Sequence, residues 1–363
     1  MMRRCLALCS LTAALFAAPD GQCRAQSRAD GTTTVIGVVS MRDGGLALGY
    51  SVVSIPRLER EQFTNERGVF VITGVPLGLT HLRVRHLGYT PQELDVVVRP
   101  GENDTIHVAL SHIAVRLSAI EVRAYPICTR PGAPDPAADS GFATVFGQLR
   151  QNADQYRLLS RAYPFRTAVE RTTSVIYADN RTRRERVDTI GLRSVDEWQY
   201  KPGGVVVQDR KMFWRVGAVQ MRVPTLAALA DTSFISHHCF YNGGLETIDG
   251  RELVRIDFVA ASSIRDPDVD GAMYLDPSNF QIRRTFLHLS KRPNAVPDLL
   301  ETEATTIFSE LLPSVPIISA ISSVNRLVPA RNAINPATGT GEEQRLIAVE
   351  FTGGRPGEQP KRP

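Results

Sequence analysis

The sequence of 363 residues lacks the motifs that most readily identify an enzyme. None of its seven histidines has glutamate three positions later, and no His-Glu-x-x-His run occurs, so the zinc-peptidase signatures are missing. A Gly-x-Ser-x-Gly nucleophile motif and a glycine-rich phosphate loop are missing too. These absences predict a non-catalytic protein and leave an enzyme of unrecognised type as an alternative. The histidines occupy positions 81, 86, 107, 112, 237, 238 and 288.

Lysine is scarce, because only four of the 42 basic residues are lysine and the others are arginine. Such a bias more often reflects a GC-rich genome than a binding surface. The formal net charge of +4 is close to balance. We therefore expect neither nucleic acid nor an anionic membrane surface as a partner.

Long apolar runs are confined to the start of the chain. Two arginines precede an apolar run of 14 residues over 5–18, which is typical of an export signal and too short to span a bilayer. Residues 1–25 are predicted to be a signal peptide that is cleaved after Ala25, which lowers the net charge from +4 to +2. We expect no transmembrane segment in the mature chain, and a location in the periplasm, at the outer membrane or outside the cell.

Cysteine is rare, since only two of the five cysteines lie beyond the predicted signal peptide. An even pair in an oxidising compartment usually forms a disulfide, so we expect Cys128 to bond to Cys239. Closing a loop of about 110 residues stabilises a protein by roughly 4–5 kcal/mol. The competing interpretation is a metal site, because His237 and His238 precede Cys239. Adjacent residues on a strand point to opposite faces, which favours the disulfide.

Residues 33–111 contain short apolar segments separated by turn signals, without a helical period. The segments 33–40, 46–55, 69–73 and 79–86 are typical of strands, and the Asp-Gly-Gly sequence at 43–45 is typical of a hairpin turn. This pattern predicts an antiparallel β-sandwich of about seven strands.

Three motifs in this region point to a known family. The sequence TNERGVF at 64–70 is followed by GVPLG at 74–78 and by Gly88-Tyr89. Residues 33–111 thereby resemble the carboxypeptidase regulatory-like domain, whose members carry Thr-Asp-x-x-Gly-x-Phe, Gly-x-Pro-x-Gly and Gly-Tyr in this order. LALGY at 46–50 departs from the usual Pro-Leu-x-Gly-Ala. The resemblance implies a transthyretin-like sandwich.

The next segment, 112–139, ends in a linker rich in proline and alanine. A helix is predicted over 140–162, capped by Asp139 or Ser140 and stopped by Pro164. We expect its apolar face to cover a sheet. That face consists of Phe142, Val145, Phe146, Leu149, Ala153, Tyr156 and Leu159.

The rest of a C-terminal domain, 140–352, is predicted to be β-rich. Turn signals lie at 242–244, 249–250, 270–271 and 276–279, and the prolines at 313 and 316 are expected to break a strand. GAMYLDP at 271–277 followed by IRR at 282–284 resembles a hairpin of lipoprotein-carrier-like half-barrels. This resemblance implies a curved antiparallel sheet with one packing helix, so the fold class is mainly β. The tail 353–363 is expected to be disordered.

Asp266, Asp268 and Asp270 match the first half of a calcium loop, with carboxylates at alternate positions followed by glycine. The twelfth position is Pro277 instead of the expected glutamate. Because Asp270-Gly271 is itself a turn signal, a hairpin turn is the preferred interpretation and bound calcium the alternative. We expect no other cofactor.

Trp198, Tyr200, Phe213 and Trp214 form an aromatic group that could stack on a sugar. Their position in or beside predicted strands favours core packing instead.

The main functional hypothesis is an exported, non-catalytic binding or scaffolding module of the cell envelope, with a protein, peptide or glycan as partner. The alternative is a periplasmic carrier that holds a lipid or another apolar ligand on the concave face of a C-terminal half-barrel.

Overall fold

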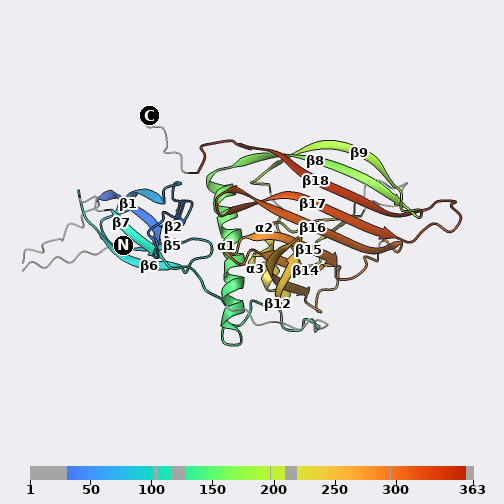
Figure 1. Cartoon of the computed structure of the whole chain (residues 1–363), viewed down its shortest axis with the longest axis horizontal. Coiled ribbons are helices and arrows are strands. Elements are labelled where there is room, and N and C mark those ends of the chain that lie inside the picture. The colour runs from blue at the N-terminus through green and yellow to red at the C-terminus, as the bar shows by residue number, and fades with distance from the viewer. Residues whose placement is uncertain are drawn as a thin grey trace, which may run out of the picture.

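The computed structural model describes residues 31–101, 105–115, 127–196, 198–208, 219–294 and 296–356. The predicted signal peptide, 1–25, lies outside these ranges, as do parts of the predicted linker and tail. Two β-rich domains lie on either side of a long helix, α1 (Ser140–Ala162), so the fold is mainly β as predicted (Figure 1). Within the described ranges no helix is long and apolar enough to span a membrane.

The N-terminal domain is a sandwich of two sheets. One sheet has the strand order β4-β1-β7 and the other has the order β3-β2-β5-β6. A 3-10 turn, η1 (Pro56–Leu58), joins β2 to β3. The strands are β1 (Thr32–Met41), β2 (Val52–Ile55), β3 (Arg60–Phe63), β4 (Val69–Pro76), β5 (Gly78–Arg85), β6 (Gln92–Val98) and β7 (Ile106–Leu110).

The described part of the sandwich has seven strands, as predicted. The expectation that all of them pair antiparallel is wrong. β1 and β7 pair in parallel, with Gly37 opposite Ile106 and Met41 opposite Leu110. After β6 the chain crosses from one sheet to the other and runs beside β1 in the same direction. Alternation of apolar side chains specifies which face of a strand is buried, and it does not specify strand direction.

Local turn chemistry in the sandwich is close to the prediction. Gly68 has a φ of +73°, and a Cβ there would lie 2.4 Å from the carbonyl oxygen of Val39, so glycine is required. The strand predicted over 46–55 is confirmed only at Val52–Ile55. β3, which is mostly polar, was not predicted.

Helix α1 has the predicted bounds. The Asp139 side chain caps it by accepting a hydrogen bond from the Phe142 N–H at 2.8 Å. Its apolar face is buried against the large sheet, where the rings of Phe146 and Phe240 lie 4.6 Å apart between centroids. Pro164 follows the helix, as predicted.

The C-terminal domain is built on one curved sheet, which is antiparallel throughout. The last strand, β18, pairs with β8, which follows α1 directly. In spatial order the strands are β12 (His238–Ile248), β13 (Arg251–Ala260), β14 (Val269–Leu275), β15 (Ile282–Leu289), β16 (Leu299–Leu312), β17 (Val315–Leu327), β18 (Ala337–Phe351), β8 (Phe165–Tyr177) and β9 (Thr182–Arg193).

Several elements of this domain differ from the prediction. The turn expected at 242–244 is a bulge inside β12, and Pro316 lies inside β17 opposite Glu310. Pro313 does end a strand, as predicted, because it lies in the turn between β16 and β17. Three short elements were not predicted: β11 (Val219–Met221), α2 (Leu226–Leu229) and α3 (Thr232–Ile235). β10 (Val206–Gln208) lies within the segment 204–208, which the sequence pattern predicts as a strand.

The two domains are packed together through α1. Tyr50 and Phe63 of the sandwich share a buried cluster with Leu159 of α1 and with Phe165 and Ile317 of the large sheet. The sandwich therefore contributes directly to the end of the C-terminal domain that lies beside α1.

Candidate functional site

A cavity of about 540 Å³ lies between the large sheet and the segments that cover it. Its floor comes from β8, β9, β17 and β18, which extend away from α1 (Figure 1). Its cover comes from α1 and from the chain between β9 and α2. This volume is within the range of about 300–1,000 Å³ that is typical of small-ligand sites. The lining includes Tyr156, Phe165, Thr167, Val169, Leu192, Trp198, Val223, Ile317, Ile321, Gln344 and Leu346.

Strand pairing explains why apolar side chains gather on this floor. Phe165, Thr167 and Val169 alternate along β8 and therefore share one face. Leu346 of β18 lies directly opposite Val169, so the apolar surface continues onto the neighbouring strand. Phe165 and Val169 are 2% and 8% exposed, whereas Leu346 is only half-buried. The floor is thus apolar and partly uncovered.

The apolar floor is bordered by paired charges. Arg193 donates two hydrogen bonds to Asp196, at 2.6 and 2.8 Å, where the chain leaves β9. Two residues beyond Val169 on β8, Arg171 makes a two-point contact with Asp188, at 3.0 and 2.7 Å. These guanidinium groups hold the pKa values of Asp196 and Asp188 below their usual range. The site therefore joins an apolar floor to a charged border.

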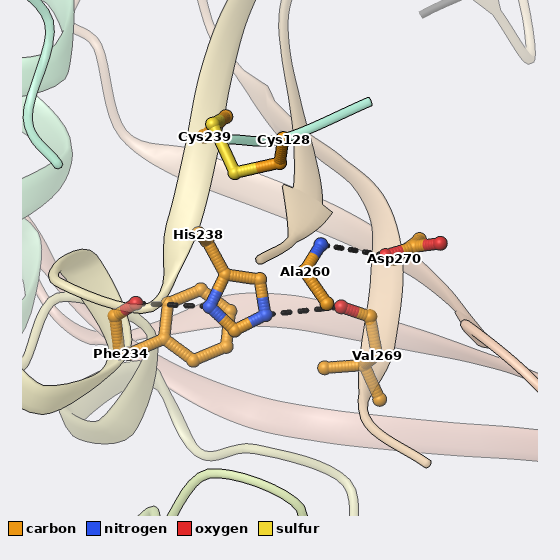
Figure 2. Close-up of a disulfide and its surroundings, with 7 residues drawn as sticks. All are labelled: Cys128, Phe234, His238, Cys239, Ala260, Val269 and Asp270. Atoms are coloured by element: carbon orange, nitrogen blue, oxygen red, sulfur yellow. Dashed lines mark hydrogen bonds between the residues drawn. A yellow bond between two sulfur atoms is a disulfide. The ribbon is translucent and has the colours of Figure 1, made fainter. Parts of the chain in front are cut away.

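The predicted disulfide is confirmed and lies at the edge strand β12. Cys128 and Cys239 are bonded with an Sγ–Sγ distance of 2.10 Å and a Cα–Cα distance of 5.6 Å (Figure 2). It fastens the segment that precedes α1 to the large sheet. The competing interpretation of a metal site with His237 and His238 is wrong, because Cys239 is oxidised and both rings face carbonyl oxygens.

A buried polar group lies beside this disulfide (Figure 2). His238 Nδ1 is 2.9 Å from the oxygen of Phe234, and Nε2 is 3.0 Å from the oxygen of Val269. Burial lowers the pKa of His238, while the two carbonyl oxygens and the Asp268 carboxylate, 3.8 Å away, favour its charged form. His238 and Asp268 have no exposed surface, so a substrate cannot reach them without opening the core. We assign this group to the folded core.

The three aspartates of the calcium hypothesis do not converge. Asp268 accepts hydrogen bonds from the Tyr200 hydroxyl and from the Gly203 N–H, at 2.7 and 2.8 Å. Asp270 accepts one from the Ala260 N–H at 2.7 Å (Figure 2). Within the described ranges no cluster of three or more His, Cys, Asp or Glu side chains could hold a metal ion. Bound calcium stays an untested hypothesis.

The preferred interpretation of this segment as a hairpin turn is wrong. Asp270 and Gly271 lie inside β14, where Gly271 pairs with both Phe258 and Leu287. A Cβ at Gly271 would lie 2.0 Å from the oxygen of Phe286, so glycine here permits a close approach of two strands.

The aromatic group is divided between two environments. Tyr200 packs in the main core against Phe234, and burial raises its pKa. Trp198 is half-buried and lines the cavity, with the Arg222 guanidinium 5.8 Å from its ring centroid. Phe213 and Trp214 lie outside the described residues. Core packing is therefore confirmed for Tyr200, while Trp198 belongs to the candidate site.

Sequence reasoning found few of the cavity residues. The signals that could have found them are the alternation at 165–169 and a tryptophan in the irregular segment after β9. β17, which supplies Ile317 and Ile321, was not predicted at all.

The solved structures that resemble this chain include three weak likenesses. They are a lipoprotein-sorting protein domain from Vibrio parahaemolyticus (11% identity, TM-score 0.29, covering 58% of this chain and 94% of that chain), a LolA superfamily protein from Nitrosomonas europaea (11%, 0.29, 57% and 93%) and a DUF1329 family protein from Desulfovibrio piger (10%, 0.30, 58% and 93%). Scores this low assign neither a family nor a ligand to this chain.

No protein family model matches the chain, and no curated protein matches it. The resemblance of residues 33–111 to the carboxypeptidase regulatory-like domain therefore gains no support beyond the two-sheet architecture itself.

Proposed function

We propose that this protein is a carrier that holds an acyl chain of a lipid in the cavity between the large sheet and α1. The observation that supports it is the cavity of about 540 Å³, with an apolar floor built from Phe165, Val169 and Leu346. Each methylene moved from water onto such a surface contributes roughly 0.8 kcal/mol, so a chain of several methylenes binds without any strong polar contact.

A carrier was the alternative hypothesis from the sequence, and a binding or scaffolding module was the main one. The position of the cavity supports the carrier, because the cavity lies in the C-terminal domain and not in the sandwich. The proposal includes no catalytic step, and the absence of enzymatic activity stays a prediction. Export to the periplasm likewise stays a prediction from residues 1–25.

Filling the cavity from its floor tests the proposal. Thr167 faces the cavity, whereas its neighbour Ala168 points to the other face of β8. The protein is incubated with phospholipid vesicles and re-isolated, and bound lipid is counted by native mass spectrometry. We expect bound lipid in the unaltered protein and in Ala168→Trp, and a several-fold loss in Thr167→Trp. A lipid-free mass for the unaltered protein would contradict the carrier function.

A further inference from the structure

A second cleft, of about 1,090 Å³, opens between the sandwich and the C-terminal domain. Residues of β3 and β5 form one wall, and residues of α1, α2 and α3 form the other. Ser194, Trp198 and Thr225 line both this cleft and the apolar cavity. The two spaces are therefore adjacent.

The lining of the cleft is charged, in contrast to the cavity. A row of ion pairs crosses it from the sandwich to α3, with alternating charge. Arg85 Nη2 is 3.0 Å from Glu61 and Arg85 Nη1 is 3.1 Å from Asp154. Arg157 Nη1 is 3.6 Å from Asp154 and Arg157 Nη2 is 3.2 Å from Asp231. The row thus reads minus, plus, minus, plus, minus.

The charge of the cleft is nearly balanced. Arg60, Arg83 and Arg161 add positive charge beside the row, and Glu59 adds a negative charge, so the lining holds five arginines and four carboxylates. Within the row, a ligand group with one sign of charge pairs with one member by taking it from that member's partner, which leaves the partner without its counter-ion. A group that carries both signs close together can replace an ion pair without leaving either member unpaired.

We propose that the cleft binds the head group of a zwitterionic phospholipid whose acyl chain lies in the apolar cavity. The phosphate contacts the Arg157 guanidinium, which can bind phosphate through two parallel hydrogen bonds. The ammonium contacts the carboxylates of Asp154 and Asp231. This inference rests on the proposed carrier function and gives the sandwich a role in it, because Glu61 and Arg85 form one wall of the head-group site.

A competition between head groups tests the inference. The protein is incubated with vesicles that hold equal amounts of phosphatidylethanolamine and phosphatidylglycerol with identical acyl chains. It is then re-isolated, and the ratio of the two bound lipids is measured by mass spectrometry. We expect phosphatidylethanolamine to be enriched roughly twofold to fivefold, the range that one partly exposed ion pair accounts for.

Two variants move the charge of the cleft in opposite directions. Asp231→Asn keeps a residue that can cap α3 and removes a carboxylate, so we expect the ratio to shift toward phosphatidylglycerol. Arg157→Gln removes the phosphate partner, so we expect total bound phospholipid to fall while diacylglycerol binding is retained. Arg150→Gln, on α1 but outside this cleft, is the matched control and should keep the original ratio.

The outcomes separate the two proposals. Bound lipid with the same ratio as the vesicles, or enriched in phosphatidylglycerol, overturns the head-group site and leaves the carrier function standing. Equal shifts in Asp231→Asn and in the control also overturn it. No bound lipid of any kind overturns the carrier function and this inference together.

Discussion

His86 Nε2 lies 3.4 Å from the hydroxyl of Ser314, so a side chain of the sandwich meets the turn between β16 and β17 of the large sheet. On its other side, Nδ1 is 3.0 Å from Ser51 Oγ. The Ser51 hydroxyl donates its one proton to the oxygen of Leu48 at 2.8 Å, so it accepts from His86. The contacts therefore place a proton on Nδ1.

Protonation of His86 at acidic pH should lower the unfolding free energy of the protein. Burial lowers its pKa from 6.5 to about 4. The unfolded chain then binds a proton at a higher pH than the folded chain does. The unfolding free energy is therefore unaffected by His86 above pH 6.5 and falls between pH 6.5 and about 4, by a few kcal/mol at about 1.4 kcal/mol per pKa unit.

Denaturant unfolding at several pH values measures this effect. His86→Gln should give a smaller loss of stability between pH 6.5 and 4 than the unaltered protein. His81→Gln, at an exposed site on β5, is the control and should keep the loss in that window. The same pH dependence with and without His86 would show that another group is responsible.

Breaking the disulfide should destabilise the C-terminal domain. Cys128 and Cys239 are 111 positions apart, and a loop of about that length contributes at most roughly 4–5 kcal/mol through chain entropy. We expect the Cys128→Ser/Cys239→Ser double variant to lose up to that amount of unfolding free energy. Dithiothreitol should lower the stability of the unaltered protein and leave the double variant unchanged. Two free thiols in the denatured, unreduced protein would contradict the bond.

Asn152 on α1 should be one of the most sensitive polar positions. Its side chain is fully buried, donates to the oxygen of Phe280 at 2.9 Å and accepts from the Ile282 N–H at 3.0 Å. Asn152→Ala leaves both backbone groups unsatisfied, so we expect a loss of about 2–4 kcal/mol of unfolding free energy. Arg150→Ala, exposed on the same helix, should cost under about 0.5 kcal/mol. Equal losses in the two variants would argue against this role.

Calcium should leave the melting temperature unchanged. The carboxylates of Asp268 and Asp270 already accept hydrogen bonds from protein donors, and those donors would have to be displaced by an ion. Differential scanning fluorimetry at millimolar calcium measures this, with a chelator as the control. A rise in melting temperature that the chelator reverses would support the calcium hypothesis instead.

The sequence predicted those features that depend on residues close together in the chain. The bounds of α1 follow from Asp139, a 3.6-residue apolar period and Pro164, all within one segment. The turn at 249–250 is confirmed for the same reason. The disulfide was predictable although its cysteines are distant, because only one pairing remained beyond the predicted signal peptide.

Predictions of turns from local residue types were wrong where long-range strand pairing was stronger. Gly243 and Gly271 lie in segments with turn signals, yet both are inside strands. Gly243 lies at a bulge where β12 pairs with β13, and Gly271 lies in β14, which pairs with β13 on one side and β15 on the other. The hydrogen bonds gained along a long ladder outweigh a local preference for a turn. The parallel pairing of β1 and β7 also depended on a crossover that no local pattern encodes.

By itself, the sequence determined a mainly β chain with one long amphipathic helix and one disulfide, because period, capping and cysteine count are local or countable properties. Only the tertiary structure decided where a ligand could bind. The cavity exists because β18 returns to pair with β8, and the charged cleft exists because Arg85 of the sandwich reaches Asp154 of α1. Contacts between residues so far apart in the chain are set by packing of whole elements, which no short stretch of sequence contains.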